Sequence, residues 1–168
     1  MNKNHSLSIE KVFELAIENH QKNNHEAAKN LYEKVLKIDP NYARAHNNLG
    51  VIFKALGEHQ KAKDCFEKAI EITPNYAHAH SNIGAIFNIF GDTKKAIDCY
   101  EKAIEIDPKH KDALYNLGGV FKNLGDTKKA INCYQKVIEI DPRHKDALYN
   151  LGVALLVTKQ YKNALEQF

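Results

Sequence analysis

The sequence predicts an all-α fold, a solenoid made of antiparallel helix pairs. The first observation is a strict period, because the only prolines stand 34 residues apart: Pro40, Pro74, Pro108 and Pro142. The second is that glycines and alanines keep the same step, as Gly50 and Gly84 or Ala28 and Ala62 do. The third is that apolar residues within each period recur every three or four positions, which is typical of amphipathic helices.

The period divides the chain into a short polar lead, residues 1–8, and a single continuous array, residues 9–168. The array contains five repeats, the last of them incomplete: Ile9–Tyr42, Ala43–Tyr76, Ala77–His110, Lys111–His144 and Lys145–Phe168. A single helix pair leaves apolar faces uncovered, so we expect the pairs to stack side by side.

The fourth repeat shows why each half should be helical. Apolar side chains follow a 3.6-residue period from Ala113 to Leu124, and Gly125 comes next, as a glycine commonly does at a helix end. Asp126 can cap a second helix, in which the period continues from Ala130 to Ile138. Pro142 then closes this helix, because the residue before a proline is pushed out of the helical region.

Small residues should control how the two helices of a pair meet. Gly118 on the first helix and Ala130 on the second would allow a close approach of the backbones. A glycine inside a helix costs roughly 0.5–1 kcal/mol relative to alanine. Its recurrence in four repeats therefore predicts that a neighbouring group occupies the space beside it.

The two ends of the array are expected to differ. Lys11, Glu18 and Lys22 form one helical stripe, at positions where the second repeat has the apolar residues Ala45, Ile52 and Leu56. A polar stripe is expected on a terminal repeat that no other repeat covers. The fifth repeat instead keeps the apolar interior pattern, so we expect a longer protein and an exposed apolar edge on the last helix: Ala147, Ala154, Leu155, Leu165 and Phe168.

Composition favours a soluble protein with charges of both signs on its surface, and it does not favour binding to nucleic acid or insertion in a membrane. The net charge of +3 is modest, with 27% charged residues of both signs, whereas nucleic-acid binding proteins concentrate basic charge. The longest apolar run, Leu151–Val157, is far shorter than the ~20 residues that a membrane helix needs. The first eight residues are polar and lack the apolar core of a signal peptide, so we expect a cytoplasmic location.

No residue pattern predicts catalysis, a cofactor or a metal site. Glycine-rich phosphate loops, nucleophile elbows and paired histidines at helical spacing do not occur in the sequence. Three cysteines stand 34 residues apart, Cys65, Cys99 and Cys133, and their spacing predicts small packing residues rather than disulfides. We interpret His46 and His80, at equivalent positions, as packing residues with one satisfied ring nitrogen.

The repeat resembles the tetratricopeptide repeat (TPR) family, which shares its length. The matching residues of the fourth repeat are the Gly125-Asp126 turn and Asn116, Leu117, Gly118, Phe121, Ala130, Tyr134 and Pro142. The resemblance covers residues 9–168 and implies a right-handed superhelix whose first helices line a concave surface. It implies little about function, because members of the family share a scaffold rather than a chemistry.

Four asparagines at the sixth position of successive repeats are the leading candidates for ligand binding on that surface: Asn48, Asn82, Asn116 and Asn150. An asparagine amide can donate to a peptide carbonyl and accept from a peptide N–H. With repeats ~9–10 Å apart, each asparagine would meet about every third residue of an extended ligand. The arrangement is similar to the asparagine ladder in the repeat arms of nucleocytoplasmic sugar-transferring enzymes. The alternative is that these asparagines only satisfy the inner surface of the protein.

Other candidate ligand-binding residues surround the asparagines. The second position of the repeat carries Arg44, His78, Asp112 and Asp146. The fifth position carries Tyr115 and Tyr149, which offer rigid aromatic surface, and the twelfth carries Lys54 and Lys122. Gly119 should leave a gap beside Asn116 where a ligand backbone could approach.

Three functional hypotheses follow. The leading one is a protein-interaction scaffold that grips an extended peptide, or a segment of a partner protein, through the asparagine ladder. The second is self-association, with repeats of different molecules stacking through the uncapped C-terminal end. The third is the recognition arm of a larger transferase. The family's clamp for the C-terminal carboxylate of chaperones requires Lys and Asn at the fifth and ninth positions of one repeat, where the first repeat has Phe13 and Ile17. No later repeat restores that pair.

Overall fold

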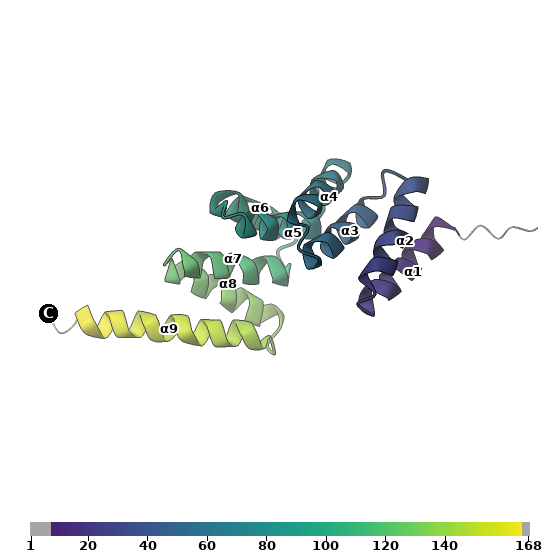
Figure 1. Cartoon of the computed structure of the whole chain (residues 1–168). Helices are drawn as coiled ribbons and strands as arrows, with labels where there is room; N and C mark the ends of the chain where they lie inside the picture. Colours follow the sequence, from purple (N-terminus) through teal and green to yellow (C-terminus); the bar gives the residue numbers. More distant parts are fainter. Residues whose placement is uncertain (1–7, 166–168) are drawn as a thin grey trace, which may run out of the picture. The chain divides into compact units, whose positions relative to one another are not determined.

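The computed structural model describes the backbone of residues 8–165 and the side chains of residues 8–159. Seven residues of the polar lead, the side chain of Leu165 and all of Phe168 therefore lie outside the described residues. Within the described part every regular element is an α-helix (Figure 1). The helices are α1 (Ile9–Gln21), α2 (His25–Ile38), α3 (Ala43–Ala55), α4 (His59–Ile72), α5 (Ala77–Ile89), α6 (Thr93–Ile106), α7 (Lys111–Asn123), α8 (Thr127–Ile140) and α9 (Lys145–Leu165).

The chain divides into two compact units, Met1–Ile86 and Phe87–Phe168, and the division falls within α5. We call them the N-terminal unit and the C-terminal unit and describe each by itself. In the N-terminal unit α1 packs on α2, α2 on α3 and α3 on α4. In the C-terminal unit α6 packs on α7, α7 on α8 and α8 on α9. In these pairs, helices adjacent in sequence are adjacent in space, as the repeat pattern predicts.

Local sequence signals set the helix boundaries. The backbone turns between paired helices at Gly57, Gly91 and Gly125, each with φ of 78°, a region that glycine adopts at little cost. The next residue caps the second helix in two repeats, where the carboxylates of Asp92 and Asp126 accept from backbone N–H groups three residues on. The signal predicted at Gly125-Asp126 is thereby confirmed.

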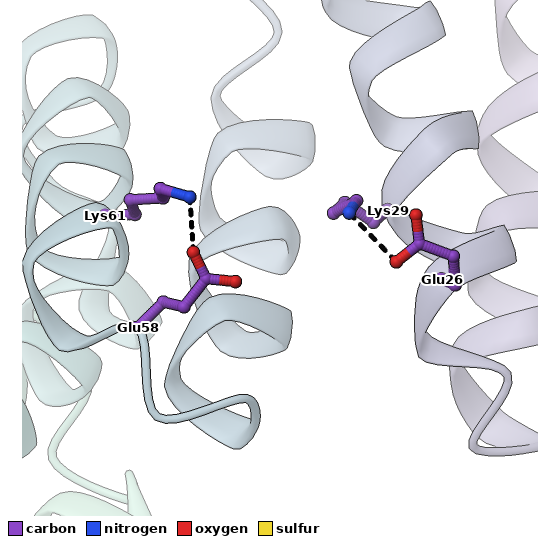
Figure 2. A network of polar contacts seen from close by, with 4 residues as sticks. All are labelled: Glu26, Lys29, Glu58 and Lys61. Atoms are coloured by element: carbon purple, nitrogen blue, oxygen red, sulfur yellow. Dashed lines mark hydrogen bonds and ion pairs between the residues drawn. The ribbon is translucent and has the colours of Figure 1, made fainter.

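Exposed ion pairs reinforce the starts of the second helices. Figure 2 shows Glu26 paired with Lys29 on α2, and Glu58, the N-cap residue of α4, paired with Lys61. The hydrogen bond from Lys29 to Glu26, 2.9 Å long, raises the pKa of the lysine. These contacts lie one turn apart on a helix surface, where opposite charges support the helix.

Each second helix buries one aromatic ring, and the glycines of the first helices make room for it. A Cβ atom added at Gly50 would lie 2.6 Å from the Phe66 ring, and one added at Gly118 would lie 2.7 Å from the Tyr134 ring. Both rings are buried. The space beside these two glycines is thus filled by an aromatic side chain of the same repeat. Beside Gly152 of the fifth repeat a Cβ would meet nothing within 4 Å, so the predicted neighbouring group is absent there among the described residues.

The polar stripe predicted on the first repeat is solvent-exposed at Lys11, Glu18 and Lys22. Of its apolar counterparts in the second repeat, Ala45 and Ile52 are fully buried, but Leu56 is 45% exposed. Leu56 is the C-cap residue of α3, so it lies beyond the packed turns of that helix. The expectation of burial is therefore wrong for this residue.

The fifth repeat does not show the helix–turn–helix form of the others. Lys159 and Gln160 stand where earlier repeats have their turn, and α9 continues through them as one helix of 21 residues (Figure 1). Without a second helix folded back on it, α9 exposes large apolar side chains, including Leu148, Leu155 and Leu156. An exposed apolar edge is therefore present, as predicted, but of the residues named for it only Leu155 is exposed, whereas Ala147 and Ala154 are buried. None of the helices in the described part is long and apolar enough to cross a membrane.

Candidate functional site

The predicted ligand-binding residues fall into two sets, one in each compact unit. The N-terminal unit holds Arg44, Asn48 and Lys54 on α3 and His78 and Asn82 on α5. The C-terminal unit holds seven residues on α7 and α9: Asp112, Tyr115, Asn116, Lys122, Asp146, Tyr149 and Asn150. All come from first helices, so the repeat places them on corresponding faces of the helix pairs.

Hydrogen bonds connect the ladder asparagines of the N-terminal unit. The Asn82 amide donates to Asn47 Oδ1 at 3.0 Å, and the Asn47 amide donates to Asn48 Oδ1 at 3.2 Å. The Asn48 amide in turn donates to the Tyr32 hydroxyl at 3.3 Å. Asn47 is only 5% exposed, so this chain of side chains is anchored in the interior. The orientation of both ladder residues is therefore fixed by the protein itself.

The flanking residues of the N-terminal unit contact aromatic rings. The Arg44 guanidinium lies over the Phe13 ring, 4.9 Å from its centroid, a favourable cation–π geometry. The His78 ring meets Tyr76 edge-on at 6.1 Å. Lys54 is half-buried on α3. Arg44 and His78 are thus both exposed and both in contact with an aromatic ring.

A second hydrogen-bond chain occurs in the C-terminal unit. The Lys122 ammonium donates to Asn150 Oδ1 at 3.0 Å, and the Asn150 amide donates to the Tyr115 hydroxyl at 3.2 Å. The Tyr115 ring is stacked on His144 at 5.1 Å and lies 5.9 Å from Tyr134. Three predicted residues, Tyr115 and Lys122 of α7 and Asn150 of α9, are therefore brought together.

Asn116 differs from the other three ladder residues. Among the described residues, no hydrogen-bond partner is present for its amide, although the side chain is half-buried. It lines a small pocket in the C-terminal unit, of about 150 Å³, together with Asn88, Tyr100, Tyr115, Gly119, Val120, Lys122, Asn123, Tyr134 and Asn150. A Cβ added at Gly119 would meet nothing within 4 Å, so the gap predicted beside Asn116 is present. We call this cavity the Gly119 pocket.

The tyrosines of the Gly119 pocket are neutral hydrogen-bonding groups. Burial raises the pKa of both Tyr100 and Tyr134 to about 12, so their hydroxyl protons stay in place at neutral pH. A hydroxyl both donates and accepts, and the asparagine amides do the same. The pocket therefore offers several polar groups and one cation, Lys122.

Three predicted residues of this unit do not join the pocket. Asp112, Asp146 and Tyr149 are exposed on α7 and α9, and Tyr149 is 73% exposed. Asp112 and Asp146 lie in the first turn of their helices, where a carboxylate favours the positive end of the helix dipole. A contribution to helix stability is sufficient to account for their positions.

A larger hollow of the same unit lies over the second helices. It measures about 480 Å³, and Lys128, Asn132 and Lys136 of α8 line it above apolar residues of α7. None of the predicted ligand-binding residues lines this hollow. The Gly119 pocket is smaller, but it brings four of them together.

Other reactive side chains form no site. Burial raises the pKa of Cys65, Cys99 and Cys133 to about 11, so these thiols are poor nucleophiles. The described residues contain no group of three side chains that could hold a metal ion. His46 and His80 each bond one ring nitrogen to a proline carbonyl, at 2.9 and 2.8 Å, which confirms their interpretation as packing residues.

Protein-family models match the sequence over nearly the whole chain. Models described as tetratricopeptide repeat match residues 41–109, 112–144 and 133–166, and one described as TPR repeat matches residues 18–57. The chain belongs to the tetratricopeptide repeat family. Its fold class, an all-α TPR solenoid, is thereby confirmed.

Solved structures of TPR proteins share the fold. A structure of MamA is 28% identical, with a TM-score of 0.74, and covers 90% of this chain and 88% of its own. YrrB, described as a TPR protein with an unusual peptide-binding site, is 27% identical, with a TM-score of 0.70, and covers 93% and 80%. PilF of Pseudomonas aeruginosa, 22% identical, has a TM-score of 0.83 and covers 94% and 72%. No curated protein matches the sequence.

The TPR register also shows which site residues sequence reasoning missed. Two of the four sixth-position asparagines donate to the fifth-position side chain of the preceding repeat, Asn82 to Asn47 and Asn150 to Tyr115, 35 residues apart in both cases. The polar residue at the fifth position of the second repeat was therefore the sequence signal that could have identified Asn47 as part of the site. Asn88 and Asn123, at the twelfth and thirteenth positions, complete the Gly119 pocket and carried no comparable signal.

Proposed function

We propose that this TPR protein binds an extended peptide, or an extended segment of a partner protein, on the face formed by its first helices. The observation that carries the proposal is the Gly119 pocket, where the unpartnered amide of Asn116 borders open space. A half-buried amide without a partner lacks hydrogen bonds that a peptide backbone can supply.

The other ladder asparagines support the proposal through their geometry. Asn48, Asn82 and Asn150 each donate one hydrogen bond to a neighbouring side chain. An asparagine has two N–H groups and two lone pairs on its oxygen, so each keeps bonding capacity for a ligand. Side chains held in place lose less conformational entropy on binding, which favours affinity. The structural role and the binding role of these residues are therefore compatible.

The comparison with YrrB also supports peptide binding. That protein is described as having an unusual peptide-binding site, and its structure is 27% identical to this chain over most of the length of both. Each hydrogen bond to a ligand contributes only about 1 kcal/mol net, so several contacts along the face are required. A long, extended ligand fits this requirement better than a compact one.

A peptide array tests the proposal directly. Wild-type protein should retain a set of extended peptides, and the Asn82→Ala/Asn116→Ala double variant should lose them, because it removes one amide from each unit. Asn132→Ala, an exposed substitution on α8, is the matched control and should bind as the wild type does. Circular dichroism must show equal helix content in all three proteins. Peptide binding that survives in the double variant would make the asparagines purely structural.

Self-association is a second candidate function, and the apolar edge of α9 favours it. Leu148, Leu155 and Leu156 are 45%, 47% and 63% exposed on this helix. Wild-type protein should then show a molar mass in light scattering that rises with concentration, and Leu155→Glu should abolish the rise. A monomer at all concentrations would exclude it. The transferase hypothesis stays a prediction, which the coding sequence beyond Phe168 can test.

A further inference from the structure

We infer that the Gly119 pocket selects a carboxylate side chain, best an aspartate, within the bound peptide. The inference rests on the proposed function, because it assigns ligand chemistry to part of the same face. It does not follow from the asparagine ladder itself, which would hold any peptide backbone whatever its side chains.

The pocket exists because one repeat lacks a side chain. The ninth position of the repeat is Ile17, Val51, Ala85 and Val153 elsewhere, and only the fourth repeat has glycine there. The resulting cavity, about 150 Å³, has room for a short polar side chain.

The charge of the lining favours an anion. Lys122 is the sole formally charged residue among those that line the pocket. Its ammonium group has three N–H donors, of which Asn150 accepts one at 3.0 Å. The remaining donors can reach a ligand without breaking that contact.

The polar groups of the pocket can donate to the same anion. The Tyr115 hydroxyl oxygen accepts from Asn150, so its own proton remains available for donation. The Asn116 amide has no partner among the described residues. An ionised carboxylate only accepts hydrogen bonds, and it therefore matches a pocket whose open groups can all donate. Hydrogen bonds to ionised acceptors are also stronger than those to neutral amides.

One electrostatic effect opposes the carboxylate. Lys122 lies in the last turn of α7, where the helix dipole places roughly half a negative charge. The full positive charge of Lys122 outweighs this partial charge, but it does so at an exposed position where water screens it. We therefore expect a modest preference for aspartate over asparagine, about fivefold in Kd, as for other exposed ion pairs.

The pocket differs from a clamp for a peptide C-terminus. That clamp has Lys and Asn at the fifth and ninth positions of a repeat, which here are Tyr115 and Gly119. Because a free C-terminus also carries a carboxylate, the experiment must separate the two sources.

The test uses pools of nine-residue peptides, acetylated and amidated at their ends and random except for a fixed central residue. Immobilised wild-type protein should retain the Asp-centred pool about five times better than the Asn-centred pool. Lys122→Gln and Gly119→Val should reduce this ratio to about one, since the first removes the charge and the second fills the cavity with the valine of other repeats. Lys128→Gln, an exposed lysine of α8 that does not line the Gly119 pocket, should leave the ratio unchanged.

The outcomes separate this inference from the proposed function. Equal retention of both pools, with loss of both in Asn116→Ala, would overturn the acidic pocket and leave peptide binding in place. If the two amidated pools are retained equally, and the Asn-centred pool is retained better once it carries a free C-terminal carboxylate, then the pocket binds a peptide C-terminus and not an aspartate side chain. Retention of no pool above a bare support would overturn both proposals. An independent test titrates the protein with N-acetyl-aspartate amide and, separately, with N-acetyl-asparagine amide, and follows the NMR signal of the Asn116 side-chain amide. The aspartate compound should shift this signal at lower concentration.

Discussion

The adjacent glycines of α7, Gly118 and Gly119, should respond with opposite signs to the same substitution by alanine. Both changes gain about 0.5–1 kcal/mol of helix stability. At Gly119 the new methyl group meets nothing within 4 Å, so the gain is retained. At Gly118 it would lie 2.7 Å from the buried Tyr134 ring and 3.1 Å from Cys133 Cβ, far inside normal contact distance. Overpacking of this kind costs about 1–3 kcal/mol.

The propensity gain is common to both variants, so the difference between them isolates the packing cost. Gly118→Ala should be about 1–3 kcal/mol less stable than Gly119→Ala, which corresponds to roughly 3–10 °C in Tm for a protein of this size. Urea and thermal unfolding, followed by far-ultraviolet circular dichroism and by tyrosine fluorescence, measure the difference. Agreement of the two probes is needed because repeat arrays can depart from two-state unfolding. Equal stability of the two variants would refute the account of glycine as the residue that accommodates the aromatic ring.

Three further predictions concern single groups. Asp126→Ala should lower Tm by about 2–4 °C through loss of the helix cap. Since the hydrogen bond from the Lys129 backbone lowers the pKa of Asp126, this deficit should shrink as the pH falls below about 4 and vanish only below the lowered pKa of the folded protein. Burial, and to a lesser extent the neighbouring His25, lower the pKa of His20. The unfolded chain therefore binds more protons than the folded one below about pH 6.5, and the N-terminal unit should lose stability between pH 7 and 5. His20→Gln should reduce that loss. At pH 8 the folded cysteines, with pKa values of about 11, should react with iodoacetamide about a hundred times more slowly than in urea.

The helices and turns of this protein could be predicted from its sequence because their causes are local. A proline every 34 residues and the Gly125-Asp126 turn act within one helix turn of the residues concerned. The helix bounds also agree with the apolar period, because that period too is a local property of the sequence. The continuity of α9 was also encoded locally, since Lys159 and Gln160 replace the turn residues.

The site was predictable only in part, because its decisive features depend on contacts between repeats. The four ladder asparagines look equivalent in the sequence, yet three donate to neighbouring side chains and Asn116 does not. The difference arises from the residues that surround each amide, which lie 16 or 35 positions away in the chain. A repeat pattern reports which residues share a face, but not which of them are already bonded.

The distinction between the two glycines connects the stability of the fold with its proposed function. Gly118 is required by a ring inside its own repeat, whereas no contact within the described residues accounts for Gly119. A residue that lowers helix stability without a packing reason is expected at a functional position. Gly119→Ala should therefore give a more stable protein that binds the Asp-centred peptides less well, and a variant that gains stability while keeping full binding and selectivity would show that Gly119 has no role in the site.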